Sequence, residues 1–173
     1  MLKTFSVNAD KAEIKNLVAE WLELLAQEKY AEALELILYD NTQVVDATLW
    51  TWTPQNLEAA VFTYGMPWFT KEEMKKRYGE DCRVDYKVTS VLARSDKEEL
   101  LEKIDVLFFD DAVTDEMAKT WGIEKLDYKN IIGDVICDCV LLDGEPSDLS
   151  ALFWIQKTDD ENMTLIFRDL HVM

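Results

Sequence analysis

The sequence is poor in the residues on which several kinds of site depend. It has five glycines, three prolines, three cysteines and one histidine among 173 residues. The scattered glycines form no Gly-rich turn before a lysine, which argues against a phosphate-binding loop. The odd cysteine count, Cys82, Cys137 and Cys139, gives no disulfide framework, so we expect buried free thiols in a reducing compartment. Because His171 lies far along the chain from them, we expect no metal site and no cofactor.

Basic residues and long apolar runs are also scarce. Eighteen Lys and Arg stand against 35 Asp and Glu, a net charge of −17. A nucleic-acid binder needs a basic surface, so this class is excluded, and anionic membranes are disfavoured for the same reason. No run approaches the roughly 20 apolar residues of a membrane span, and the N-terminus lacks the apolar stretch of a signal peptide. We therefore expect a soluble, cytoplasmic protein of bacterial type.

What the chain does contain is enough apolar material for one core. Hydrophobic residues make up 49% of it, with six tryptophans, which argues against disorder. The length is typical of one compact domain, and we expect residues 1–173 to form a single α+β domain.

The last third of the sequence predicts a three-strand meander. Residues 131–142, 149–157 and 163–172 are rich in Ile, Val, Leu and aromatic side chains and are separated by Gly, Pro and Asp clusters. In the second hairpin we expect four facing pairs, namely Phe153 with Phe167, Trp154 with Ile166, Leu152 with Arg168, and Ala151 with Asp169. Both faces of this hairpin carry large apolar groups, so we expect each to be covered in places by helices or by a second copy of the chain.

The upstream sequence predicts helices that cover this sheet. Capping signals and apolar stripes indicate helices at residues 10–25, 30–37, 53–64, 70–79 and 114–121. Alternating residues at 83–93 predict a fourth strand beside the meander. Residues 96–109 keep helical spacing after a capping-box pair, Asp96 and Glu99; a strand at 104–109 is the alternative, and we favour the helix.

In this order the elements resemble the NTF2-like, or cystatin-like cone, superfamily. The resemblance rests on the helix pair around Trp21–Leu34, the helix Thr53–Gly65 and the closing strand Leu165–Val172. It implies a curved antiparallel sheet of about four strands packed against the N-terminal helices, with room for a pocket between them. Members include isomerases, dehydratases, binding and dimerisation modules and immunity proteins, so the resemblance does not select a function.

Four side chains in the predicted sheet are candidates for acid–base chemistry. Asp134 and Asp138 share one strand face, and a carboxylate on a half-buried face can have a raised pKa. Asp169 and His171 share another face two residues apart, within reach of each other. The alternatives are that the aspartates face water, that Arg168 neutralises one of them, and that the His–Asp pair is structural.

Two further sets are candidates for binding. A dense aromatic segment either closes the core or lines a ligand pocket, and its pocket candidates are Trp50, Trp52, Tyr64 and Trp68. An acidic segment offers a surface for a cationic partner through Glu98, Glu99, Glu102, Asp110 and Asp111.

We therefore expect a non-enzymatic binding protein, for example an acidic immunity protein that neutralises a cationic protein. The alternative is a small-molecule-binding protein or a lyase- or isomerase-type enzyme that uses a pocket of the cone fold. A homodimer that pairs exposed sheet faces is the third possibility.

Overall fold

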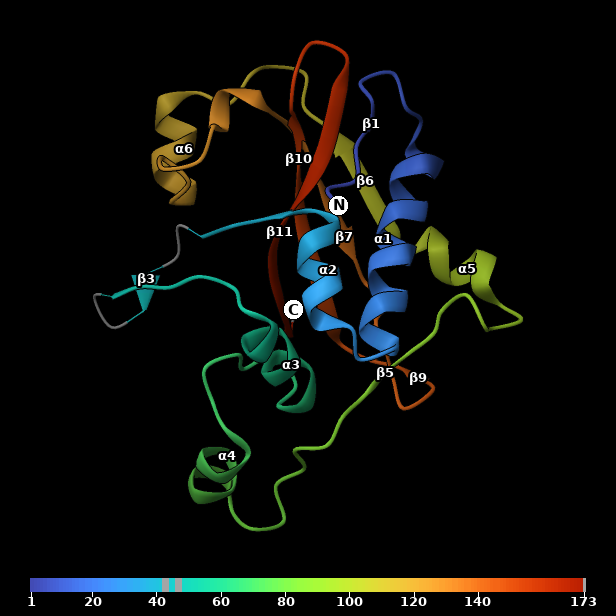
Figure 1. Ribbon diagram of the computed structural model, residues 1–173, viewed down its shortest axis with the longest axis vertical. Helices are drawn as coiled ribbons and strands as arrows, with labels where there is room; N and C mark the ends of the chain where they lie inside the picture. Colours follow the sequence, from blue (N-terminus) through green and yellow to red (C-terminus); the bar gives the residue numbers. More distant parts are fainter. Residues whose placement is uncertain (42–43, 46–47, 173) are drawn as a thin grey trace.

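A computed structural model describes residues 1–41, 44–45 and 48–172 of the chain. Its main sheet is antiparallel in the order β1-β11-β10-β7-β6, and a short strand β2 pairs in parallel with β11 (Figure 1). The strands are β1 Phe5–Ser6, β2 Leu38–Tyr39, β6 Ile104–Phe108, β7 Ile131–Cys137, β10 Leu149–Lys157 and β11 Asn162–Val172. The sheet curls around the N-terminal helices, so the predicted α+β architecture with a curved antiparallel sheet is confirmed.

The β10–β11 hairpin has the predicted register only between the bulge and the turn that joins the two strands. Phe153 faces Phe167 and Trp154 faces Ile166, but Leu152 faces Asp169 and Ala151 faces Leu170. A β-bulge between Leu152 and Phe153 places the extra residue, Arg168, on β11. The expected pairs Leu152–Arg168 and Ala151–Asp169 are therefore wrong by one residue.

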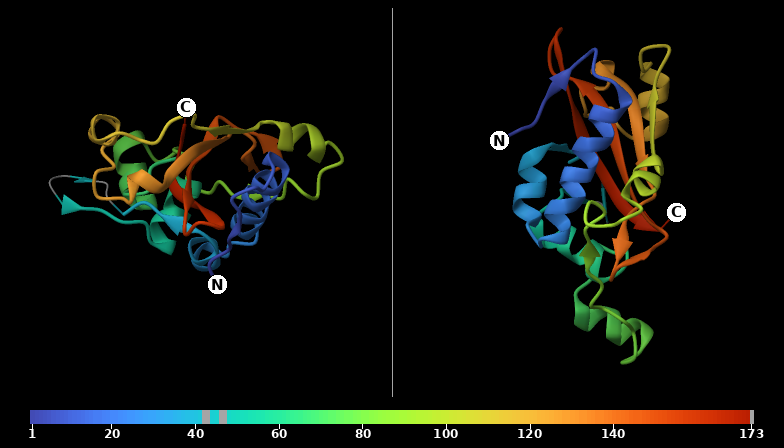
Figure 2. Two further views of the ribbon diagram at one scale, coloured as in Figure 1. Left: turned by 90° about the horizontal axis from the view of Figure 1, so that it is seen from above. Right: turned by 90° about the vertical axis from the view of Figure 1, so that its right-hand side faces the viewer.

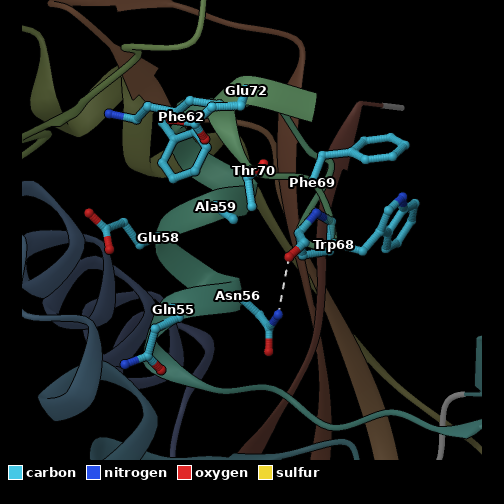
Figure 3. Close-up of a pocket in the computed structure, with 11 residues that line it drawn as sticks. Gln55, Asn56, Glu58, Ala59, Phe62, Trp68, Phe69, Thr70 and Glu72 are labelled. Atoms are coloured by element: carbon cyan, nitrogen blue, oxygen red, sulfur yellow. Dashed lines mark hydrogen bonds between the residues drawn. The ribbon is translucent and has the colours of Figure 1, made fainter. Parts of the chain in front are cut away.

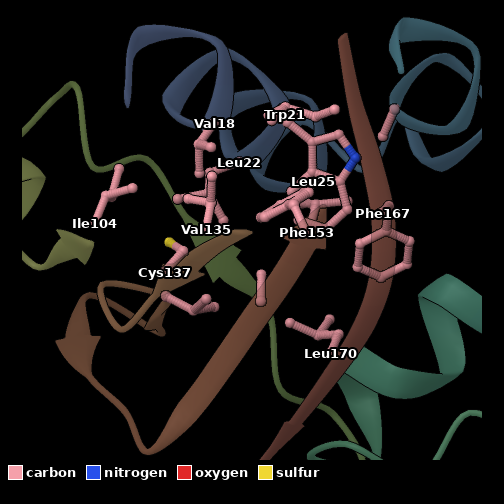
Figure 4. Packing of buried hydrophobic residues seen from close by; sticks show 14 of the residues in the cluster. Val18, Trp21, Leu22, Leu25, Ile104, Val135, Cys137, Phe153, Phe167 and Leu170 are labelled. Carbon is pink, nitrogen blue, oxygen red and sulfur yellow. The ribbon is translucent and has the colours of Figure 1, made fainter. Parts of the chain in front are cut away.

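The inner face of the sheet is covered by α1 Lys11–Ala26, α2 Tyr30–Leu36 and α3 Pro54–Phe62 (Figure 2). Asp10 and Glu13 form a full capping box at the start of α1, as the spacing predicts. Trp21 lies 5.3 Å from the Phe153 ring and 4.8 Å from the Phe167 ring, centroid to centroid (Figure 4). These side chains are completely buried, so the space between helices and sheet is filled by the core.

The helix favoured for residues 104–109 is wrong, because residues 104–108 form a strand. Helix α5 spans only Lys97–Glu102, and β6 follows at Ile104–Phe108. Ile104 and Val106 are buried while Asp105 and Leu107 are exposed, which is the two-residue period of a strand. The strand forms in place of the helix because β7 supplies the hydrogen bonds of a ladder. The capping box at Asp96 does not form, because its carboxylate binds the Arg94 guanidinium instead.

The predicted strand at residues 83–93 is also reduced. Only β5, Val88–Thr89, is regular, and it pairs with β8 Leu141–Leu142, which in turn pairs with β9 Glu145–Pro146. The strand expected at 131–142 thus divides between two sheets, β7 in the main sheet and β8 in this smaller one. A third, two-stranded sheet joins β3 Val44–Val45 to β4 Thr48–Leu49.

The outer face of the sheet is covered in part by α6 Asp115–Trp121 and the 3-10 turn Tyr128–Asn130 (Figure 2). A second apolar cluster forms there from Val113, Ala118, Ile123, Ile131, Trp154 and Ile166. Both faces are therefore covered in places by helices, as their apolar side chains predict. Helix α4, Lys71–Tyr78, projects from the body of the protein (Figure 1). Among the described helices, none has the length and apolar character needed to cross a bilayer.

Candidate functional site

A hollow of about 270 Å³ opens on the outer face of β10 and β11, beside the end of α6. The bulge in β11 and the αL residue Gly122 at the end of α6 shape its two sides. It is lined by Asp40, Trp121, Gly122, Ile123, Leu152, Arg168, Asp169 and His171. The hollow thus joins four ionisable side chains to an apolar wall.

Arg168 is the central side chain of this face. Its guanidinium carbon lies 3.8 Å from the centre of the Trp154 ring, a cation–π contact. Burial lowers the pKa of Arg168, and the neighbouring carboxylates of Asp40, Asp134 and Asp169 oppose this shift. An arginine remains charged under such conditions, so the three acids stabilise a cation held against the sheet.

Asp134 stands opposite Trp154 on β7, with Leu107 of β6 on its other side. Burial raises the pKa of this carboxyl group; Arg168 opposes the shift and Asp105 adds to it. Asp134 is thus a half-buried carboxyl group with a raised pKa, one of the alternatives that the sequence leaves open. Arg168 also acts on the Asp134 carboxyl group electrostatically across the sheet, in line with the alternative that Arg168 neutralises one of the two aspartates.

Asp169 and His171 are neighbours within the hollow. The Asp169 Oδ2 atom lies 3.0 Å from His171 Nδ1, but the two are not aligned for a hydrogen bond and Nδ1 is a buried atom without one. Ser150, opposite His171 in the ladder, donates its hydroxyl to Asp138 Oδ1 at 2.6 Å. The serine thus binds a carboxylate rather than the histidine, and no activated nucleophile results.

The four predicted acid–base residues are therefore brought to one face of the sheet but into three separate local settings. Asp134 is beside Arg168, Asp138 is bound by Ser150, and Asp169 is next to His171. The sequence missed Asp40, which directly follows β2, and Trp121 of α6; both are distant in sequence from β10 and β11 and reach the hollow through tertiary packing.

The four aromatic pocket candidates do not line one common pocket. Trp52 is buried in the core, where its Nε1 donates to the Arg168 carbonyl at 3.0 Å, and Trp50 packs on its edge. Tyr64 packs against Tyr86, 5.1 Å between ring centres. Tyr64 also lines another surface hollow, of about 280 Å³ beside Arg83, and Trp68 lines a separate groove. Core closure thus accounts for Trp52, which was the alternative for the aromatic segment.

That groove, of about 400 Å³, lies between α3 and α4 (Figure 3). Phe62, Trp68 and Phe69 give it apolar walls, and Trp68 is 52% exposed. Lys71 Nζ stands 4.8 Å from the centre of the Phe62 ring. The Asn56 side chain donates to the Pro67 carbonyl at 3.1 Å and fixes the linker that forms one wall.

The acidic candidates lie along one margin of the main sheet. Three are exposed on α5 and two follow the end of β6, namely Glu98, Glu99, Glu102, Asp110 and Asp111. Glu102 binds Lys15 of α1 at 2.9 Å. The other four form no ion pair in the part of the chain that the structure describes. Asp105 of β6, also exposed and unpaired there, extends this acidic margin.

We refer to these six residues, with the strand β6 between them, as the acidic margin. The sequence identified five of the six, but because 104–109 was predicted as helix it did not identify the strand edge that they flank.

No family model, curated protein or solved structure with which the chain was compared matches it. Within residues 1–41, 44–45 and 48–172, His, Cys, Asp and Glu side chains form no group of three suited to a metal ion. Cys137 and Cys139 are buried free thiols, as predicted; their sulfur atoms lie 3.5 Å apart and share a hydrogen bond without forming a disulfide. Functional conclusions therefore rest on the geometry of the surface.

Proposed function

We propose that the protein is a non-enzymatic binding protein that uses its acidic margin to hold a cationic protein. The observation that carries the proposal is that five exposed carboxylates around one strand, in residues 98, 99, 105, 110 and 111, form no ion pair with any residue that the structure describes. Acids that already had cationic neighbours would gain little from a partner. Unpaired ones retain their full attraction for it.

The same proposal includes three further points. The protein neutralises a cationic, toxin-like protein, it lies in the cytoplasm, and it belongs to the NTF2-like superfamily. The curved sheet and its helices support the last of these. The inner face, where a cone-fold pocket would open, is occupied by Trp21, Phe153 and Phe167. This favours a surface role over an interior ligand.

The proposal is tested with cytochrome c as a generic cationic protein. We compare the association rates of the wild type, the double variant Asp110→Asn/Asp111→Asn and the control Glu80→Gln/Asp81→Asn, an exposed acidic pair near the end of α4. The margin variant should associate several-fold more slowly, and the rate of the wild type should fall as salt rises through about 0.15 M. Equal effects of the two pairs, or a rate indifferent to salt, would overturn the proposal.

A second candidate function is small-molecule binding in the hollow beside Arg168. It is favoured by the position of Asp169 and His171 at an apolar wall formed by Leu152 and Trp121. Phenylacetate, a probe with an aromatic ring and a carboxylate, should shift the His171 and Trp121 side-chain NMR signals. His171→Gln should weaken the binding of phenylacetate. If the variant binds phenylacetate as well as the wild type, or if millimolar phenylacetate shifts neither signal, this candidate function is removed.

A further inference from the structure

Along one edge of β6, the backbone groups pair with no other strand that the structure describes. β6 is the last strand of the main sheet and, among the described strands, pairs with β7 alone (Figure 1). The Asp138 amide donates to the Lys103 carbonyl and the Phe109 amide to the Ile132 carbonyl. In an antiparallel ladder such hydrogen-bonded pairs alternate, so Asp105 and Leu107 bond to β7 while Val106 and Phe108 direct their N–H and C=O groups outward.

These outward groups have no partner in residues 1–41, 44–45 and 48–172. None of the backbone or side-chain hydrogen bonds in these ranges reaches the amide or carbonyl of Val106 or Phe108. A row of unpaired backbone groups is a template for a further strand. Proteins that recognise peptides by strand addition use such an edge for affinity and the neighbouring side chains for specificity.

We propose that β6 takes up an extended, basic segment of the partner as an additional strand of the main sheet. This inference rests on the proposed function and specifies how the cationic protein is held. The charge around the edge selects the occupant, because acidic residues stand at both ends of the strand and Asp105 lies between them. Lys103, the base at this edge, is outnumbered by Glu102, Asp105, Asp110 and Asp111, so a strand laid beside β6, roughly 17 Å long, lies in a net negative field.

The side chains of β6 define the pattern of the incoming strand. Asp105 and Leu107 project on the outer face, and Leu107 is 54% exposed. Cross-strand neighbours on one face contact each other directly. The partner therefore places a basic residue against Asp105 and an apolar residue against Leu107, with further basic residues beyond both ends of the strand.

A second copy of this chain is a poorer occupant. Pairing of β6 with its own copy would bring Asp105 and the flanking acids of both chains together, and like charges across a ladder are destabilising. The acids also act against edge-to-edge aggregation. If that were their only role, no peptide would bind, which is one outcome of the experiment.

The experiment measures binding of the blocked peptide Lys-Lys-Val-Lys-Val-Leu-Val-Lys-Lys, which can set a lysine against Asp105 and its leucine against Leu107, to the full chain by isothermal titration calorimetry at low salt. A second peptide has the same sequence with N-methyl groups on alternate amides of one edge, which removes the strand hydrogen bonds and keeps the charge. A third has Glu in place of every Lys. We expect the N-methylated and Glu peptides each to bind at least tenfold more weakly than the first.

The outcomes separate the two proposals. Equal binding of the N-methylated peptide with loss of the Glu peptide would overturn strand addition and leave the acidic binding surface standing. Equal binding of the Glu peptide would overturn the role of charge in both. No binding of any peptide would overturn strand addition and assign the acids to protection of the edge.

Protein variants provide an independent readout. Glu98→Gln/Glu99→Gln should weaken the Lys peptide several-fold, whereas the control Glu80→Gln/Asp81→Asn should not. All four residues are exposed, so these variants should fold normally, which circular dichroism checks. Equal weakening by both pairs would show attraction to net charge alone and would contradict a site at β6.

Discussion

Arg168 and Asp134 lie on either side of Trp154 on the outer face of the sheet. Burial raises the pKa of Asp134, whereas backbone amides lower the pKa of Asp159 in the β10–β11 turn. Carboxyl carbon NMR should place the titration of Asp134 above, and that of Asp159 below, the usual aspartate pKa of about 3.9. Asp159 thus serves as an internal control, and a common pKa for both would contradict the described burial.

The same shift has a consequence for stability. Since the folded state raises the pKa of Asp134, it binds this proton more tightly than the unfolded state. The wild type should therefore gain unfolding free energy relative to Asp134→Asn as pH falls from the raised pKa to below about 3.9. Urea unfolding across this range measures the difference, and a difference that is independent of pH would contradict the prediction.

Gly133 allows β6 to approach β7. A methyl group at this position would lie 2.3 Å from the Leu107 carbonyl oxygen, inside van der Waals contact. Gly133→Ala should lower the unfolding free energy by about 1–3 kcal/mol, since the two strands must separate. Chemical denaturation measures this, and a neutral effect would show that the strands do not approach so closely.

At the scale of elements, helix starts were the most predictable feature. Asp10 and Thr70 form complete capping boxes at the spacing read in the sequence. Such caps are local, so the sequence contains all the groups involved. The secondary structure of residues 104–109 is not determined by local sequence. The apolar residues from Leu100 to Phe108 fit the spacing of a helix, but the ladder with β7 makes 104–108 a strand.

The bulge at Arg168 was unpredictable for the same reason. A one-residue shift between strands leaves no signal in the hydrophobic pattern of a hairpin that is apolar on both faces. It also decides which β11 side chains line the hollow. The candidate site was found only in part because its other walls come from elements that reach it through tertiary packing. Asp169 and His171 were identified, whereas Asp40 and Trp121 were not.

The α1 capping box gives a prediction at this scale. Asp10→Ala removes the acceptor for the Glu13 amide, 2.9 Å away, and should lower the unfolding free energy by about 1 kcal/mol. The control Asn8→Ala alters an exposed side chain just before the cap and should have little effect. Equal denaturation midpoints for all three proteins would contradict a stabilising cap.

For the whole molecule, charge is the dominant feature. A net charge of −17 on a compact chain creates self-repulsion that salt screens. The thermal midpoint should rise when NaCl is increased from about 0.01 M to 0.15 M, over which the Debye length falls from about 30 to 8 Å. Scanning calorimetry measures it, and a midpoint that falls with salt would show that attractive ion pairs outweigh the repulsion.

Hydrogen exchange of the individual β6 amides, followed by NMR in the free protein and with the Lys peptide, tests the free edge most directly. In the free protein the amides of Asp105 and Leu107, which bond to β7, should exchange slowly, and those of Val106 and Phe108 should exchange quickly. The peptide should slow the latter two amides selectively. Uniform protection along β6 in the free protein, or no change at Val106 and Phe108 when peptide binds, would contradict the account.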